Sequence, residues 1–430
     1  MQDSTLRQLK HDNPSVVLRT LAAIRDCPCS RFPGLGAEIT RLQTDSDPGL
    51  RRAAVASANQ LGDGERDACL LRALQDGHAS VRQAAVDAIQ TTGIDLVTEV
   101  TRWIGVDNRG NPRAQQALLQ AGIRAGMPAS RLKQLAVDKS HEAHRLRAAR
   151  RQLLAENGDL GTDMHLLSCM LEERYRATMN LALLGLEPLH EPGRIGVIRA
   201  GISRRDERFV AGACEALNTL QNEPAAQLLS RLLQDSKQDT GRDALFAGAD
   251  DALQWYRGWA GELAIPPGWN GQTQHAVEET GTMSTLNDRI LLLKKSSLFS
   301  EVSTDDLRFV ADALVESEYF PGQRVFDIGE RGDHLYLIVE GRIGISLSPD
   351  PEAREFVATI GAGEHFGEMN LLDDLPRSAT AHVLEETRLL SLEKGRLRGL
   401  ILSYPEISLG IMRGLSMVVR ECHQRAADKT

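Results

Sequence analysis

Residues 366–380 have the sequence F-G-E-M-N-L-L-D-D-L-P-R-S-A-T, and this stretch decides the fold predicted for the last third of the chain. Gly367 permits a close backbone approach just before a predicted short helix, whose free N–H groups would point at an anion. Arg377 offers a planar fork of donors that suits phosphate oxygens, and Glu368 offers an acceptor that suits a sugar hydroxyl. A structural ion pair between Arg377 and Glu368 is the alternative. It leaves the glycine and the small residues after the arginine unexplained.

The segments around this stretch have an apolar period of two, which is typical of strands. Turns with glycine or proline separate them, so we expect a small β-barrel or jelly-roll whose strands include residues 324–326, 335–339, 343–345 and 356–358. Flanking helices are expected after Leu286 and from Ser303 or Thr304, where a hydroxyl can cap the first turn. A last helix is expected from Glu406, with an apolar face made of Ile407, Leu409, Ile411, Met412, Leu415 and Val418.

Residues 366–380 resemble the phosphate-binding cassette of cyclic-nucleotide-binding domains, with F-G-E at the start and P-R-S-A near the end. The resemblance extends over about residues 286–422. It implies that Glu368 accepts a hydrogen bond from the ribose 2′-hydroxyl and that Arg377 holds the exocyclic phosphate oxygens. The terminal helix would close over the base. The implied ligand-binding residues are Phe366, Gly367, Glu368, Met369, Asn370, Arg377, Ser378 and Ala379.

The choice of purine depends on Ser378. In this family a Ser or Thr after the arginine can favour guanine and an Ala can favour adenine, yet the bacterial catabolite activators carry Ser and take cyclic AMP. We therefore expect cyclic AMP ahead of cyclic GMP. Versions of the domain that do not bind usually lack the Arg or the Glu, and this chain has both.

The first half of the chain contains internal repeats. L-R-R-A-A-V at residues 50–55 recurs as V-R-Q-A-A-V at residues 81–86, and weaker copies lie between residues 13 and 220. Helical periodicity with this self-similarity predicts an α-solenoid, and the copies resemble HEAT repeats. For the later copies an irregular helical domain is the alternative. The predicted fold is therefore multidomain: a HEAT-like α-solenoid at 1–260, a linker at 261–285 and an α+β cyclic-nucleotide-binding domain at 286–430. The aromatic residues Trp255, Tyr256 and Trp259 are expected to cap the last hydrophobic face of the solenoid.

The composition is that of a folded protein without a nucleic-acid bias. Hydrophobic residues make up 42%, and the formal net charge is −9, which argues against DNA or RNA as a partner. The start of the chain is not a signal peptide, and no apolar stretch is long enough to cross a bilayer. These features favour the cytoplasm, and a place at the cytoplasmic face of the inner membrane is expected only through a partner. The six cysteines are scattered, without the spacing of a metal or redox motif: Cys27, Cys29, Cys69, Cys169, Cys214 and Cys422.

Several other functions are not supported by the sequence. Few residues follow Cys422, so no helix-turn-helix is expected. The motif H-E-A-H at residues 141–144 is one residue too short for a zinc-protease motif, and residues 45–49 lack the closing Glu of a calcium loop. No nucleophile elbow, Walker lysine or kinase signature is present. We expect no enzyme, no catalytic cofactor and no bound metal.

The order of the two predicted domains suggests how they work together. Residues 174–186 and 208–220 resemble the last repeats in a bacterial transporter-like family related to ATP/ADP translocases, in which a membrane domain precedes both modules. We predict a cyclic-nucleotide sensor in which ligand binding changes how the repeats bind a protein partner. The resemblance makes a transporter domain one candidate for that partner. The alternative is a constitutive HEAT-repeat scaffold with a structural, non-binding barrel.

Overall fold

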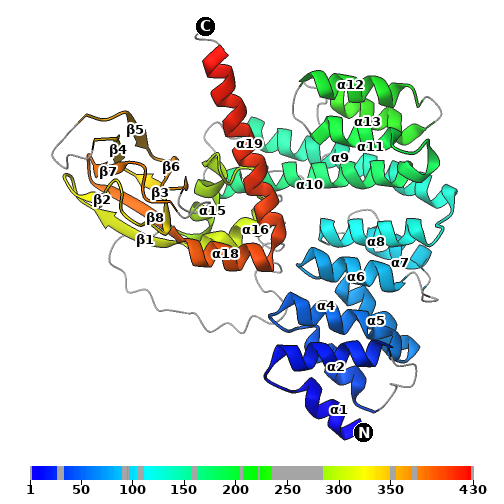
Figure 1. Ribbon diagram of the computed structural model, residues 1–430. Helices are drawn as coiled ribbons and strands as arrows, with labels where there is room; N and C mark the ends of the chain where they lie inside the picture. The colour runs from blue at the N-terminus through cyan, green and yellow to red at the C-terminus, as the bar shows by residue number, and fades with distance from the viewer. Residues whose placement is uncertain are drawn as a thin grey trace. The chain divides into compact units, whose positions relative to one another are not determined.

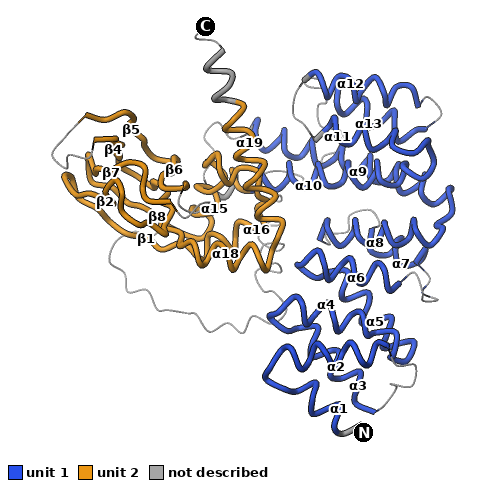
Figure 2. The backbone as a smooth tube through the Cα atoms, viewed as in Figure 1, with its two compact units in different colours: residues 1–160, 167–271 blue, residues 161–166, 272–430 orange. Residues whose placement is uncertain are grey.

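The computed structural model describes residues 2–26, 33–89, 94, 96–104, 111–156, 162–203, 207–220, 223–234, 284–348, 355–369 and 375–427. The chain forms two compact units, residues 1–160 with 167–271 and residues 161–166 with 272–430 (Figure 2). Apart from its last two residues, the predicted linker at 261–285 lies outside the described residues, and so does the predicted aromatic cap around Trp255. The predicted domain limits therefore stay predictions.

The described part of the first unit is helical (Figure 1). Two short 3-10 turns, Ala58–Gln60 and Glu187–Leu189, interrupt the series. The α-helices are α1 (Gln2–Leu9), α2 (Pro14–Asp26), α3 (Leu35–Leu42), α4 (Pro48–Ala56), α5 (Asp63–Ala73), α6 (Ala79–Ile89), α7 (Leu96–Ile104), α8 (Pro112–Arg124), α9 (Ala129–Glu156), α10 (Thr162–Leu186), α11 (Arg194–Ser203), α12 (Glu207–Asn218) and α13 (Pro224–Gln234).

The even-numbered helices from α2 to α8 pack against one another in sequence, and each also packs against the odd-numbered helix before it. Small side chains such as Ala54 and Ala85 are fully buried there, which lets the helices approach closely. The two strongest sequence copies fall in α4 and α6. Each carries an arginine with the same local contacts: Arg51 Nη1 donates to the carbonyls of Asp45 and Ser46, at 2.8 and 3.1 Å, and Arg82 Nη1 donates to those of Asp76 and Gly77, both at 2.8 Å. The copies are thus equivalent in structure, while their assignment to HEAT repeats stays a prediction.

The second unit begins with two capped helices, as the sequence predicts. In α15 (Leu286–Lys295), Thr285 and Asp288 form a reciprocal capping box. In α16 (Thr304–Asp312), the Ser303 hydroxyl accepts a hydrogen bond from the Asp306 amide at 3.2 Å. The prediction of Ser303 as a cap is confirmed.

Eight strands follow, in two antiparallel four-stranded sheets. One sheet has the order β1-β8-β3-β6 and the other the order β2-β7-β4-β5 (Figure 1). Among the described residues the strands do not close into a barrel, so the jelly-roll form of the prediction fits and the closed barrel does not. The strands are β1 (Val315–Tyr319), β2 (Arg324–Phe326), β3 (His334–Glu340), β4 (Arg342–Ser346), β5 (Ala358–Gly361), β6 (His365–Phe366), β7 (Thr380–Val383) and β8 (Thr387–Glu393).

The two sheets share one apolar core. Alternate residues of the strands point inward, as a period of two requires. The buried members come from both sheets: Phe326, Ile338, Ile343, Phe366, Ala381, Val383 and Leu389. The three predicted strands at residues 324–326, 335–339 and 343–345 are confirmed, whereas β5 begins at Ala358, later than the predicted 356–358. Phe356 instead packs its ring against Gly344 on β4 and lies 5.6 Å from the His382 ring.

The chain ends in α18 (Lys394–Ser403) and α19 (Pro405–Ala427). The predicted apolar face of the last helix is partly wrong. Ile407 and Ile411 are buried, but Leu409 and Met412 are 50% and 54% exposed. The buried stripe continues instead through Gly410 and Gly414, because the helix lies directly on the backbone of residues 297–302 and a side chain at either position would overlap it.

Candidate functional site

Arg377 lies just before β7, on a backbone held by the turn between β2 and β3. The Arg377 amide donates to the Glu330 carbonyl at 2.8 Å, and the Gly329 amide donates to the Arg377 carbonyl at 2.8 Å. These two bonds pair a short length of the β2–β3 turn with the end of the predicted cassette. The position of Arg377 is therefore set by a segment almost fifty residues earlier in the chain.

The two sheets together form a β-sandwich. The side chain of Arg377 is buried in this sandwich and is 4% exposed. Its Nη1 donates to the Gly367 carbonyl at 3.1 Å, and its Nη2 donates to the His334 carbonyl at 2.9 Å. Gly367 and Arg377, which the sequence predicts to act together, are thus in direct contact. A carbonyl is a neutral acceptor, so these bonds orient the guanidinium without cancelling its charge.

Aromatic rings form one wall beside the guanidinium. The Cζ atom of Arg377 lies 3.9 Å from the centre of the Phe326 ring and 5.8 Å from that of Tyr336. Tyr336 is stacked on Phe366, with centres 5.2 Å apart. The sequence prediction included Phe366 but missed Phe326 and Tyr336. A signal was present, because aromatics make up only 4% of the chain and both rings sit on predicted strands.

The environment of Arg377 acts on its charge in two directions. Burial lowers the pKa of the guanidinium, while Tyr336 and the nearby carboxylates of Glu330, Asp333 and Glu368 raise it. Burial also raises the pKa of the Tyr336 hydroxyl. An arginine remains protonated under such conditions. The site therefore holds a permanent cation in a largely desolvated wall, an arrangement that favours an anionic ligand.

Glu368 follows Gly367 and is half-buried. Its carboxylate forms no ion pair with Arg377, which removes the structural alternative for this pair, and accepts no hydrogen bond from any described residue. Next to it, His365 Nδ1 lies 3.0 Å from the Ser296 hydroxyl. Burial lowers the pKa of His365, against the opposing effect of Glu368 and Glu364. Glu368 is thus a partly desolvated acceptor that is available to a donor from outside the protein.

Gly367 has a φ of 76°, in the region that favours glycine. A side chain there would also meet the Arg377 guanidinium. Two further predicted residues, Met369 and Ser378, lie on the surface. Met369 is 53% exposed, and the hydroxyl of the exposed Ser378 lies 3.6 Å from the Met369 sulfur. Ala379 is half-buried. Asn370 and the helix predicted after Gly367 lie outside the described residues.

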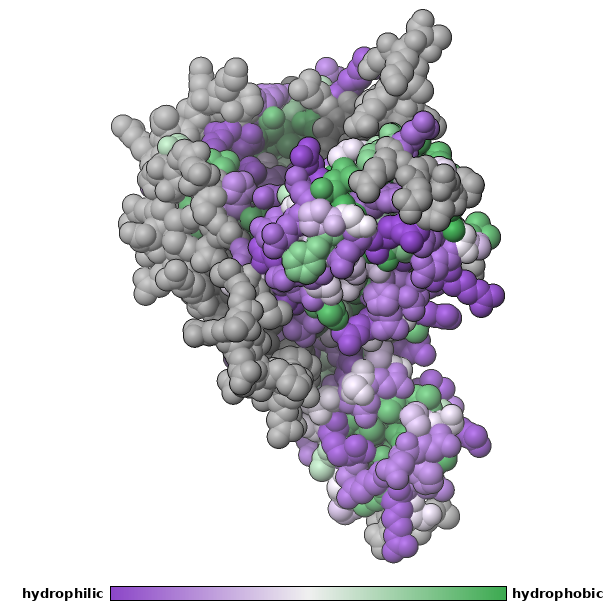
Figure 3. All heavy atoms as spheres, turned by 90° about the vertical axis from the view of Figure 1, so that its left-hand side faces the viewer, coloured by the Kyte–Doolittle hydropathy of each residue, from purple (hydrophilic) through white to green (hydrophobic). Residues whose placement is uncertain are grey.

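The rest of the described chain offers fewer candidates. Over the described ranges, no group of three or more His, Cys, Asp or Glu could hold a metal ion, and no helix has the length and apolarity to span a membrane. On the face drawn in Figure 3, most of the coloured surface is hydrophilic, with apolar side chains in scattered groups. Exposed apolar residues of the sandwich include Val315, Phe320, Leu347 and Val357.

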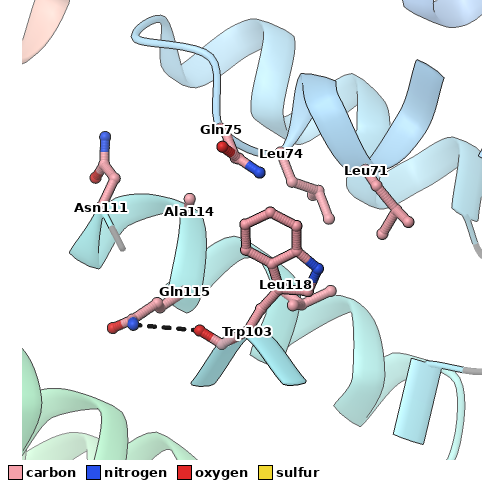
Figure 4. A pocket seen from close by; sticks show the side chains of 8 residues that line it. All are labelled: Leu71, Leu74, Gln75, Trp103, Asn111, Ala114, Gln115 and Leu118. Carbon is pink, nitrogen blue, oxygen red and sulfur yellow. Dashed lines mark hydrogen bonds between the residues drawn. The ribbon is translucent and has the colours of Figure 1, made fainter. Parts of the chain in front are cut away.

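A small pocket lies in the first unit, between the ends of α5, α7 and α8. Trp103 stands in the middle of it, and the Gln115 amide donates to the Trp103 carbonyl at 3.3 Å (Figure 4). No lining side chain carries a charge, so the pocket lacks a cation for a phosphate. Its lining residues are Leu71, Leu74, Gln75, Trp103, Asn111, Ala114, Gln115 and Leu118.

Comparisons with known proteins find relatives that match part of the chain. A CRP-like cAMP-activated global transcriptional regulator of Mycobacterium tuberculosis is 32% identical over 138 residues, which cover 32% of this chain and 61% of the regulator. A cAMP-dependent protein kinase regulatory subunit of Yarrowia lipolytica is 33% identical over 115 residues, covering 26% of this chain and 30% of the subunit. The chain thus spans less than two thirds of the length of these relatives.

A solved structure is also similar to part of the chain. The N-terminal domain of a transcriptional regulator from Streptomyces coelicolor A3(2) is 27% identical and covers 31% of this chain and 94% of that domain, with a TM-score of 0.29. The family model described as cyclic nucleotide-binding domain matches residues 316–404, which include every predicted ligand-binding residue. Residues 316–404 are therefore a cyclic nucleotide-binding domain.

Proposed function

We propose that this chain is a cyclic-nucleotide sensor that binds cyclic AMP in preference to cyclic GMP and has no catalytic activity of its own. The observation that carries the proposal is that one site holds both a buried cation, Arg377, and the half-buried Glu368 carboxylate, which accepts no hydrogen bond from a described residue. A cyclic nucleotide presents a phosphate anion close to a ribose 2′-hydroxyl. One ligand can therefore satisfy both groups at once.

The proposed roles follow from the chemistry of each group. Arg377 holds the exocyclic phosphate oxygens through its planar fork, and Glu368 accepts from the 2′-hydroxyl. Amides from Gly367 to Asn370 and at Ala379 complete the anion site, and the Ser378 hydroxyl, which is exposed beside them, adds a contact. The helix α19 closes over the base.

The relatives support the choice of ligand and the absence of catalysis. Their names describe cAMP-activated or cAMP-dependent regulators. The matched segments leave out much of each relative, so neither transcriptional regulation nor regulation of a protein kinase is carried over to this chain. What this chain takes from them is the proposal of cyclic AMP as the signal.

We propose the first unit as the output of the sensor. The matching contacts of Arg51 and Arg82 with their own turns, and the packing of α2, α4, α6 and α8 in series, favour a HEAT-like array that presents a continuous surface to a protein partner. The residues that resemble the transporter-related family, 174–186 and 208–220, lie largely in α10 and α12. A transporter domain is accordingly the partner that we propose to test first.

Isothermal titration of the full chain with cyclic AMP, cyclic GMP and 5′-AMP tests the ligand. We expect saturable heat with cyclic AMP, weaker binding of cyclic GMP and the weakest binding of 5′-AMP, whose phosphate is not held in a ring. Folding is checked by circular dichroism on the same sample. Folded protein that gives no heat with either cyclic nucleotide would instead support the alternative, a constitutive scaffold with a structural sandwich.

A further inference from the structure

Gly332 lies in the β2–β3 turn and faces the Arg377 side chain. A Cβ atom built on Gly332 would overlap the guanidinium, and its three nearest atoms are Nε, Cζ and Nη2 of Arg377. The backbone φ of Gly332 is not in the left-handed region. An alanine could therefore adopt this conformation, and the obstacle to it is the arginine alone among its nearest neighbours.

Two other glycines of the domain serve for comparison, because the space around their Cβ positions differs from that at Gly332. Gly341 has a φ of 95°, and a Cβ there would meet the Glu386 carbonyl and the Thr387 Cα. That glycine is required by the backbone itself. Gly399, on α18, has no φ in that region and nothing within 4 Å of a built Cβ. Gly332 differs from both, because the atoms in its way are the far end of a flexible side chain.

The β2–β3 turn and the strand residues at its two ends supply other groups that contact Arg377. Gly329 and Glu330 fix the arginine backbone, and the His334 carbonyl accepts from Nη2 at 2.9 Å. The Phe326 ring, at 3.9 Å from Cζ, lies at the other end of the turn. Residues 326–334 thus form a slot whose width at the guanidinium is set by the missing side chain of Gly332.

We propose that Gly332 is a positioning residue for the ligand site: its lack of a side chain keeps the Arg377 guanidinium flat against Phe326 and within reach of a phosphate. The ligand part of this inference rests on the proposed cyclic-nucleotide function, but the slot itself does not. Gly332→Ala moves the guanidinium and not the backbone. The effect of the substitution must therefore depend on Arg377 being present.

A double-mutant cycle tests this dependence without ligand. The full-length wild type, Gly332→Ala, Arg377→Ala and the double variant are compared by hydrogen exchange of the β3 and β7 amides, read by mass spectrometry. We expect Gly332→Ala to accelerate this exchange on the order of tenfold when Arg377 is present, and not at all in the Arg377→Ala background. Gly399→Ala is the matched neutral control and Gly341→Ala the matched backbone control.

Titration with cyclic AMP supplies the second measurement. Gly332→Ala should weaken binding on the order of tenfold, because a charge-assisted hydrogen bond is misplaced, while Gly399→Ala binds as the wild type does. Equal acceleration of exchange by Gly332→Ala with and without Arg377 would overturn the inference, and so would unchanged affinity in a wild type that binds. A wild type that binds no cyclic nucleotide would refute the proposed function. The hydrogen-exchange cycle would then still show whether Gly332 positions the Arg377 side chain.

Discussion

Two arginines, Arg51 in the helical unit and Arg377 in the sandwich, are held in different ways. Both donate to backbone carbonyls from Nη atoms. Arg51 also forms a bidentate pair with the Asp76 carboxylate, at 2.8 and 3.0 Å. Arg377 donates to the carbonyls of Gly367 and His334, and its guanidinium lies against the Phe326 ring.

We propose that this difference separates an arginine that stabilises a fold from one that binds a ligand. In the helical unit, opposite charges are matched inside the protein, as in the buried pair of Lys139 with Glu142. In the sandwich, neutral partners orient Arg377, and Glu368 accepts from no described donor. Carbonyl and aromatic contacts orient a guanidinium without neutralising its charge.

The largest effect is expected from Arg377→Ala. Cyclic AMP affinity should fall by at least about 100-fold, because the phosphate loses its charged partner in a desolvated site. Isothermal titration measures the loss. Arg377→Lys should bind with intermediate affinity, since lysine keeps the charge but not the planar fork. Unchanged affinity in Arg377→Ala, with normal circular dichroism, would refute the role assigned to this residue.

Arg51→Ala should act on the other unit and leave the ligand site alone. The side chains of Arg51 and Asp76 are 15% and 12% exposed, so removing one partner leaves a poorly solvated carboxylate and should cost about 2 kcal/mol. Urea unfolding followed by far-ultraviolet circular dichroism measures the loss, because most of the described helices belong to the first unit. The exposed neighbour Arg52→Ala is the control. A drop in cyclic AMP affinity in Arg51→Ala would contradict the division of roles.

Glu368→Gln should have a smaller effect on binding. The amide keeps the shape of the side chain and can still accept from a hydroxyl, but the charge-assisted bond is lost, so affinity should fall about tenfold. Glu364→Gln is the matched control, because this exposed carboxylate accepts from the Gly361 amide at 2.7 Å, a bond that glutamine can also make. Equal effects of the two substitutions, seen by titration, would count against a specific sugar contact.

Much of the sandwich could be predicted because its determinants are local. The strand period, the Ser303 cap and the spacing of residues 366–380 are each contained in short segments. The buried face of α19 could not be predicted in the same way. Gly410 and Gly414 carry no apolar signal, yet the close approach of residues 297–302 makes them the buried stripe, and Leu409 and Met412 are left exposed.

The candidate site likewise has a part that the sequence predicts and a part that it does not. Gly367, Glu368 and Arg377 form a motif within twelve residues, so the sequence predicted them as a set. The groups that orient Arg377 come from residues 326–334, and two of them, the His334 carbonyl and the missing side chain of Gly332, have no signature in residue type. The position of a backbone acceptor and the space around a glycine depend on the folded chain, so residue types alone do not predict them.

The smallest effect is expected from His365, a third group of the site held by a neutral partner. Its ring lies 3.0 Å from the Ser296 hydroxyl, and burial lowers its pKa in spite of Glu364 and Glu368. With the folded pKa below the usual value of about 6.5, the unfolded chain takes up the proton first on acidification. The sandwich should therefore be most stable above about pH 6.5 and lose stability as the pH falls from there toward the folded pKa.

Scanning calorimetry of the full chain between pH 7.5 and 5.5 measures this loss. The sandwich is assigned to the transition that Arg51→Ala leaves in place, which makes the comparison of the two units part of the experiment. His365→Asn keeps a polar side chain beside Ser296 but cannot titrate in this range, so its transition should depend less on pH than that of the wild type. Identical pH dependence in the two proteins would mean that the buried imidazole does not control the acid sensitivity of the ligand-binding unit.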